Sequence, residues 1–314
     1  YQQQAGVLWT ANHRISVSLN GNFNFLDGDK VTTIRGHGVG ISGLCRIPGG
    51  FATGDGRGLV LFHKYGQIPH AFWHEGGGYP AVKGLAAIGD GQKILAALSD
   101  STVVIIDSET GEEERSFKFD NPVLDVVQSQ NVVVMMTRNS LIVFRGVDSQ
   151  ILPLSFEPLA IAIASTEDEI AVGDGNGFIH FFNLAGEETG SVKSHAAPIC
   201  CIAYSAEGDK VASSSTRKDI TVWQRGQYTE ALHEGWIYHS LPITRLLFLP
   251  GGTHLISVSK DRTIRQWSLQ RKRKTLEVPK AHAQMITNVM LIDDNHIITT
   301  GDDGAIKTWE ITLI

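Results

Sequence analysis

Two stretches near the end of the chain share one pattern, and this pattern decides the fold. Residues 255–267 read LISVSKDRTIRQW, and residues 297–309 read IITTGDDGAIKTW. In each, a β-rich segment leads into a tight polar turn centred on Asp261 or Asp303, and a second β-rich segment ends in a tryptophan six residues later. A unit with this layout recurs along the chain, and a period of about 40 residues is typical of propeller blades with four strands each. We therefore expect an all-β propeller.

The composition agrees with this fold and excludes several classes of function. The 314 residues include 33 glycines, as expected where tight turns follow short strands, and 42% of the residues are apolar, enough for a large core. No run of about 18 apolar residues occurs, so no membrane span is predicted. The formal charge of −6 argues against a nucleic-acid surface, which needs a basic excess. The three cysteines, Cys45, Cys200 and Cys201, predict reduced thiols in a cytoplasmic protein.

Eight units can be counted by the ends of their third strands. These ends lie near Phe25, Phe62, Ile106, Phe144, Phe182, Trp223, Trp267 and Trp309. We interpret residues 1–314 as one WD40-type propeller of four-stranded blades. Burial of every strand edge favours eight blades for an autonomous chain, with residues 1–5 as the outer strand of the last blade. The alternative is a seven-bladed ring closed by residues 30–35, which leaves residues 1–28 as a partial blade of a preceding propeller.

A histidine precedes the first strand in four of the units, as His37, His195, His239 and His282. With a hydroxyl on the second strand, the turn aspartate and the tryptophan, such a histidine can form a buried chain of hydrogen bonds within its blade. Complete sets are predicted in the last two units: His239, Ser257, Asp261 and Trp267, and His282, Thr299, Asp303 and Trp309, with Ser259 and Thr300 as alternative hydroxyls. In the sixth unit, Arg217 stands where the aspartate is expected.

The repetition of this set gives these histidines a structural role. A catalytic triad occurs once in a protein and needs an exposed hydroxyl, whereas this arrangement recurs from blade to blade. Residues 54–58 resemble a phosphate-binding loop but lead into a strand, and His70, His74 and Glu75 have a spacing that suits a helix rather than the strand and loop predicted there. We therefore expect no enzyme, no metal, no cofactor and no small-molecule substrate.

Two connections between units are long and aromatic. The first contains Trp73, His74 and Tyr79, and the second contains Trp236 and Tyr238. Both join the last strand of one unit to the first strand of the next, so both are predicted to emerge on the same face of the ring. Because tryptophan and tyrosine are enriched in binding hot spots, we take these five residues as candidates for partner contact. The alternative is that each tryptophan folds back over its own blade.

The recurring histidine, hydroxyl, aspartate and tryptophan form the WD40 pattern, and the two ends of the chain carry a narrower resemblance. Residues 3–9 (QQAGVLW) and 15–27 (ISVSLNGNFNFLD) resemble the mid-chain junction of the actin-interacting protein 1 family, in which such a strand pair precedes a blade that begins with Gly-His, here Gly36 and His37. The ending, from Ala281 and His282 to residues 306–312 (IKTWEIT), is similar to the closing segment of that family.

This resemblance implies a place and a function for the chain. It would correspond to the C-terminal one of two seven-bladed propellers, in a family that works with cofilin to take actin filaments apart. Actin and cofilin are then the expected partners, in the cytoplasm and at the actin cytoskeleton, with no nucleic acid and no membrane. The alternative is a generic WD40 scaffold or adaptor subunit of a multiprotein complex, which binds a peptide across the mouth of the channel.

Overall fold

The fold was analysed in a computed structural model that describes residues 4–9, 14–18, 23–27, 30–34, 36–65, 67, 69–73, 80–146, 148–271 and 273–314. These residues form 31 strands in eight antiparallel sheets. None of them belongs to a helix that is long and apolar enough to cross a membrane.

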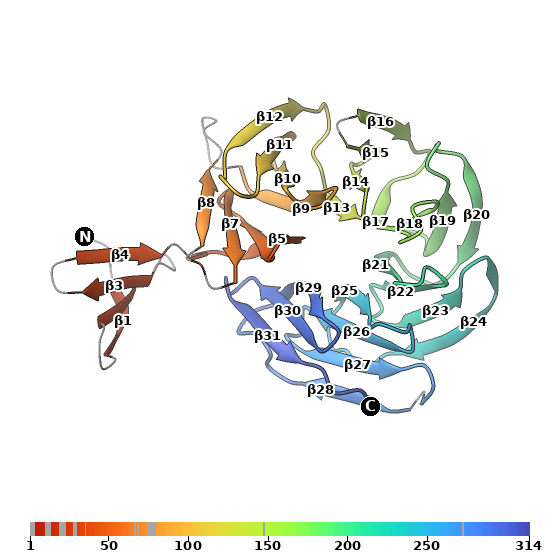
Figure 1. Cartoon of the computed structure of the whole chain (residues 1–314). Coiled ribbons are helices and arrows are strands. Elements are labelled where there is room, and N and C mark those ends of the chain that lie inside the picture. Colours follow the sequence, from red (N-terminus) through yellow and green to blue (C-terminus); the bar gives the residue numbers. More distant parts are fainter. Residues whose placement is uncertain are drawn as a thin grey trace.

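Seven of the sheets are the blades of a closed ring (Figure 1). Blade 1 comprises β5 (Ile41–Ile47), β6 (Gly50–Asp55), β7 (Leu59–Lys64) and β8 (His70–Trp73). Blade 2 comprises β9 (Val82–Ile88), β10 (Lys93–Leu98), β11 (Thr102–Asp107) and β12 (Glu113–Lys118). Blade 3 comprises β13 (Asp125–Gln128), β14 (Val132–Met136), β15 (Ser140–Arg145) and β16 (Asp148–Pro153).

The other half of the ring has four further blades. Blade 4 comprises β17 (Pro158–Ile163), β18 (Ile170–Asp174), β19 (Phe178–Phe182) and β20 (Glu188–Lys193). Blade 5 comprises β21 (Ile199–Tyr204), β22 (Lys210–Ser215), β23 (Ile220–Gln224) and β24 (Gln227–Trp236). Blade 6 comprises β25 (Ile243–Phe248), β26 (His254–Ser259), β27 (Ile264–Ser268) and β28 (Thr275–Val278). Blade 7 has three strands, β29 (Ile286–Asp293), β30 (His296–Gly301) and β31 (Ile306–Glu310).

The strands differ in burial according to their distance from the axis. In each blade the first strand lies nearest the axis and the later strands follow outward in chain order (Figure 1). The second strands pack between neighbouring blades, so β14 is buried at every residue, whereas the outer strand β12 is mostly exposed. Blades approach closely: a Cβ at Gly54 would lie 2.5 Å from a methyl carbon of Val82 in the next blade. The core is therefore a series of apolar layers between blades.

The eighth sheet lies outside the ring (Figure 1). It contains β1 (Gln4–Trp9), β2 (Arg14–Ser18), β3 (Phe23–Asp27) and β4 (Lys30–Ile34), paired in that order. The expectation of an all-β propeller is confirmed, and the ring has seven blades, so the favoured count of eight is wrong and the seven-bladed alternative is confirmed. The ring closes after seven because blade 7 packs directly on blade 1, where Asn288 donates a hydrogen bond to the Ser42 carbonyl at 3.0 Å.

The segments that were expected to complete the last blade lie elsewhere. Residues 4 and 5 belong to β1, which pairs with β2, and residues 1–3 lie outside the described residues. Residues 30–34 form β4, which pairs with β3. Neither residues 4 and 5 nor residues 30–34 lie beside β31, so among the described strands the last blade ends on its third.

Candidate interaction surface

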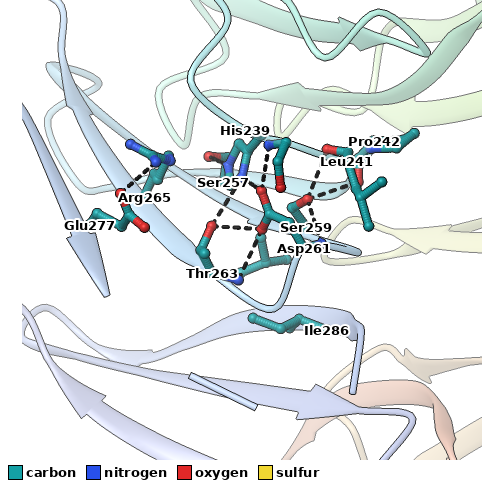
Figure 2. A network of polar contacts seen from close by, with 12 residues as sticks. His239, Leu241, Pro242, Ser257, Ser259, Asp261, Thr263, Arg265, Glu277 and Ile286 are labelled. Carbon is teal, nitrogen blue, oxygen red and sulfur yellow. Dashed lines mark hydrogen bonds and ion pairs between the residues drawn. The ribbon is translucent and has the colours of Figure 1, made fainter. Parts of the chain in front are cut away.

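A buried hydrogen-bond chain anchors the loop that precedes blade 6 (Figure 2). His239 Nδ1 donates to Asp261 Oδ2 at 2.9 Å, and His239 Nε2 accepts from the hydroxyl of Ser257 at 2.7 Å. The Trp267 indole N–H donates to the same hydroxyl oxygen at 2.8 Å. Asp261 also accepts from the backbone N–H of Ser240 at 2.8 Å. Asp261, in the turn between β26 and β27, thus holds both the imidazole of His239 and the backbone of the loop.

Blade 7 repeats this arrangement with a threonine. His282 Nδ1 contacts Asp303 Oδ1 at 3.0 Å and His282 Nε2 contacts Thr299 Oγ1 at 2.8 Å. The Trp309 indole donates to Thr299 at 2.8 Å. The alternative hydroxyls have other partners: Ser259 donates to the carbonyl of Leu241 at 3.0 Å, and Thr300 bonds Thr287 at 3.0 Å.

Blade 5 completes its set with an aspartate that the sequence pattern missed. His195 bonds Asp219 Oδ2 and Ser213 Oγ, each at 2.8 Å. Arg217 does occupy the expected position, and Asp219, two residues further along a turn of the same length as in blade 6, bonds the histidine in its place. The Trp223 indole reaches Ser213 through Ser194, which it bonds at 3.0 Å.

Blade 1 contains a fourth set, in which a histidine replaces the tryptophan. His37 Nδ1 bonds Asp55 at 2.8 Å, and His37 Nε2 bonds Thr53 at 2.7 Å. His63 Nε2 bonds the same threonine at 2.8 Å. His63 follows Thr53 by ten residues, just as Trp309 follows Thr299 in blade 7. Burial, together with the nearby charges of His37 and His70, lowers the pKa of His63 to about 4. His63 is therefore neutral near pH 7 and can donate one N–H, as an indole does.

The turn aspartates are kept ionised by their hydrogen bonds. Burial by itself would raise the pKa of Asp219, but hydrogen bonds from His195 and Ser215 outweigh it and bring the pKa to about 2. The same balance, with hydrogen bonds from His239 and Thr263, holds the pKa of Asp261 well below its usual range. The fixed negative charges are consistent with a structural role for these chains.

An ion pair crosses the middle of the ring. Arg245 on β25 bonds Asp125 on β13 at 2.8 Å, and these strands belong to blades 6 and 3, on opposite sides of the axis (Figure 1). The pair spans the central channel, so a ligand that passed through the ring would have to break it.

The two aromatic connections differ in what they expose. Trp236 is 3% exposed and stacks on Trp267 of blade 6 at 5.1 Å between ring centroids, so it packs on the next blade rather than over its own. Tyr238 also stacks on Trp267, at 5.8 Å, but is 55% exposed, and the Arg265 guanidinium lies 5.9 Å from its ring. Trp73 ends β8 in the first connection, while His74 and Tyr79 lie outside the described residues.

Several exposed apolar side chains lie on the face where the connections between blades emerge. The loop before blade 6 exposes Ile237 and Leu241 beside Tyr238, and the sequence analysis singled out only the tyrosine. Leu124 and Leu159 are exposed at the inner strands of blades 3 and 4, at the same end of those strands. We call Leu124, Leu159, Ile237, Tyr238 and Leu241 the apolar loop face. An exposed apolar group of this kind is typical of a protein-binding surface.

The comparison with protein families identifies the repeat. The model of the WD domain, G-beta repeat, matches residues 186–224 and 233–268, which run from the outer strand of blade 4 to the third strand of blade 6. The chain is a β-propeller that contains WD40 repeats at residues 186–224 and 233–268. The matched region contains the hydrogen-bond chains of blades 5 and 6, and blades 1 and 7 carry the same chain.

Curated relatives match the WD40 chain over nearly its full length. It is 23% identical to actin-interacting protein 1 of Drosophila melanogaster over 99% of this chain and 53% of the relative. It is 23% identical to the Caenorhabditis elegans protein of the same name over 98% of this chain and 53% of the relative. It is 25% identical to the 66 kDa stress protein of Physarum polycephalum over 98% and 53%. The chain thus resembles actin-interacting protein 1 and spans about half the length of the relatives that it matches.

A solved structure supports the fold alone. The computationally designed Ika8 protein aligns with a TM-score of 0.68 at 19% identity, over 99% of this chain and 96% of that one.

Proposed function

We propose that this WD40 propeller is a non-enzymatic interaction module that recognises cofilin-decorated actin and promotes filament disassembly in the cytoplasm. The observation that carries the proposal is the match over 98–99% of the chain to relatives named actin-interacting protein 1 in two animals. Residues 3–27 and 281–312 are the segments that resemble that family in sequence. By the same resemblance, the chain corresponds to the C-terminal propeller of the longer relatives.

The apolar loop face supplies the binding surface in this proposal. Tyr238 offers an aromatic side chain that is more than half exposed on one side and held by Trp267 on the other. Its neighbour His239 is fixed by Asp261 and Ser257, so the loop loses little freedom when a partner binds. A rigid aromatic anchor with apolar neighbours is a common form of binding hot spot.

Filament assays with matched variants test the proposal. The chain is added to actin filaments with and without cofilin, and sedimentation and filament length are measured. We expect shorter filaments only when cofilin is present, and a weaker effect from Tyr238→Ala at an unchanged melting temperature. Tyr65→Ala is the control, because Tyr65 is 61% exposed but lies in the turn after β7, at the opposite end of the strands. No cofilin-dependent effect of the unmodified chain would refute the proposal.

A generic scaffold or adaptor function is the second candidate, and two leucines favour it. Leu124 and Leu159 belong to the inner edge of neighbouring blades, where a peptide lying across the channel mouth would contact them. An adaptor would bind its partner without actin, and Leu159→Glu would abolish that binding while the filament assay stayed unchanged. A cofilin-dependent effect that is lost with Tyr238→Ala would exclude this alternative as the main function.

A further inference from the structure

Five cations lie around the loop before blade 6. The turn between the second and third strands of blade 5 carries Arg217 and Lys218, the same turn of blade 6 carries Lys260 and Arg262, and the loop before blade 7 carries Lys280. We call these five residues the basic cluster. All of them are exposed except Lys218, which is half-buried. No side chain among the described residues forms an ion pair or a hydrogen bond with the charged group of any of the five.

The basic cluster reaches both ends of the loop before blade 6. On the side of blade 5, Ile220 pairs with Trp236, and this pairing brings the turn that holds Lys218 beside the start of the loop. On the side of blade 6, the backbone N–H of Lys260 donates to the carbonyl of Pro242 at 3.1 Å, at the end of the same loop. The exposed residues of the apolar loop face that lie in this loop therefore have cations on both sides.

Lys280 extends the basic cluster toward blade 7. The carbonyl of Arg262 accepts a hydrogen bond from the backbone N–H of Ala281 at 2.9 Å. This bond holds the start of the loop before blade 7 against the turn of blade 6, so Lys280 lies beside Arg262. The cations thus follow one another over the neighbouring turns and loops of blades 5, 6 and 7.

The carboxylates of the same turns point inward. Asp219, Asp261 and Asp303 each bond a buried histidine, and their side chains are 26%, 5% and 11% exposed. The fourth carboxylate, Asp302, is half-buried, and burial and the charge of Asp303 raise its pKa, an effect that the charge of Lys260 opposes. The charge that these turns present to solvent is therefore mainly positive, on a chain whose formal net charge is −6.

Three of the five cations adopt a backbone conformation that favours glycine. Five described residues other than glycine have a positive φ, and Lys218 (73°), Arg262 (71°) and Lys280 (52°) are three of them. In blades 1, 4 and 7 a glycine with φ between 70° and 83° occupies the turn position of Lys218 and Arg262. The left-handed region costs free energy for a residue with a Cβ. Strain of this kind is typical of functional sites, so it indicates that the cationic side chains are needed there.

We propose that the basic cluster binds an acidic segment of a protein partner, and that apolar side chains beside this acidic segment contact Tyr238 and Leu241. An apolar centre with a charged rim is the usual anatomy of a protein–protein interface, and opposite charges across the rim provide specificity. Nucleic acid fits less well, because the chain as a whole is acidic. The inference rests on the proposed function for the role of the apolar loop face, and it adds the chemistry of the partner.

Peptide binding to the full chain tests the charge of the partner. The probe is a fluorescent peptide rich in glutamate with a few leucines, and its counterpart has lysine in place of glutamate. We expect only the acidic peptide to bind, and Lys260→Glu with Arg262→Glu to weaken its binding at least about tenfold. Arg138→Glu is the control, because Arg138 is exposed on the corresponding turn of blade 3 and should leave the affinity unchanged.

Two results of this experiment would overturn the proposal. One is an unchanged affinity for the acidic peptide in the variant with both substitutions. The other is tighter binding of single-stranded DNA or of phosphatidylserine vesicles than of the acidic peptide, since either would assign the cations to phosphate groups.

Glycine variants test whether the strain serves binding. Lys218→Gly with Arg262→Gly should raise the melting temperature by about 1–3 °C, because the strain is relieved, and should weaken peptide binding at least about threefold. Ser101→Gly is the control, because Ser101 has a φ of 70° at the same turn position in blade 2 and lies outside the basic cluster. It should raise the melting temperature and leave binding unchanged. Unchanged binding in the first variant would refute a contact role for these cations.

The filament assay separates this inference from the proposed function. If the acidic peptide binds the basic cluster and the chain has no cofilin-dependent effect on filaments, the proposed function fails and the binding site stands. If the effect on filaments is present and is the same in Lys260→Glu with Arg262→Glu, the inference fails and the proposed function stands.

Discussion

Acidification should destabilise this propeller through His63. Its pKa is lowered by burial and by His37 and His70, from 6.5 to about 4. Between these two values the unfolded chain binds a proton that the folded chain does not, so stability is present above the unfolded pKa and falls as the pH falls. Each pKa unit corresponds to about 1.4 kcal/mol, so His63 should account for a loss of about 2 kcal/mol between pH 7 and pH 5 and about 3 kcal/mol at most.

Variants at this position separate His63 from the other titrating groups. His63→Gln and His63→Trp both keep a neutral N–H donor near Thr53, and neither side chain titrates. Reversible urea unfolding at pH 7 and pH 5 should show that the loss of unfolding free energy on acidification is about 2 kcal/mol smaller in both variants than in the unmodified chain. Tyr65→Ala is the control, because this side chain is exposed close to His63 in the sequence and takes no part in the hydrogen-bond chain, so the difference should be unchanged. The same pH dependence in all four proteins would refute the argument.

Three further changes test other parts of the fold. Trp236→Ala should lower the unfolding free energy by about 3–5 kcal/mol, because a buried ring is removed from its stack on Trp267. An unchanged melting temperature would contradict this packing role and favour a role of Trp236 in partner contact. Asp303→Ala should cost about 1–3 kcal/mol by removing the acceptor of His282, while Asp302→Ala next to it should not destabilise in the same urea titration. A double-mutant cycle of Asp125→Asn and Arg245→Met should give a coupling energy of about 1 kcal/mol, because the pair is partly exposed, and a value near zero would contradict a persistent bridge.

The hydrogen-bond chains show which of their members can be predicted from residue spacing alone. In blades 6 and 7 the tryptophan and the turn aspartate keep their spacing, so Asp261 and Asp303 could be assigned from the sequence. The hydroxyl partner was predicted as one of two residues in each blade, and it is Ser257 in blade 6 and Thr299 in blade 7. In blade 5 the aspartate lies two residues further along a turn of the same length, so the pattern stopped at Arg217 although Asp219 completes the set. In blade 1 the tryptophan itself is replaced, and only the distance from His63 to Thr53 shows that the chain persists.

The aromatic loops show a second limit. The sequence placed Trp236 and Tyr238 in one connection and could not tell which of them reaches solvent. Their exposure depends on Trp267, which lies in a different strand and receives both rings. Ile237 and Leu241 gave no signal in the sequence, because single apolar residues in a loop are common and only their shared exposure beside Tyr238 distinguishes them.

The sequence by itself determined the repeat, the strand order within each unit and the polar chains of the most regular blades, because these depend on residues close together along the chain. The number of blades depends on how blade 7 meets blade 1, and the ion pair between Asp125 and Arg245 depends on the width of the ring that this contact closes. That meeting is decided by packing between segments about 250 residues apart, such as Asn288 on Ser42, and no local pattern specifies where a ring of similar units closes.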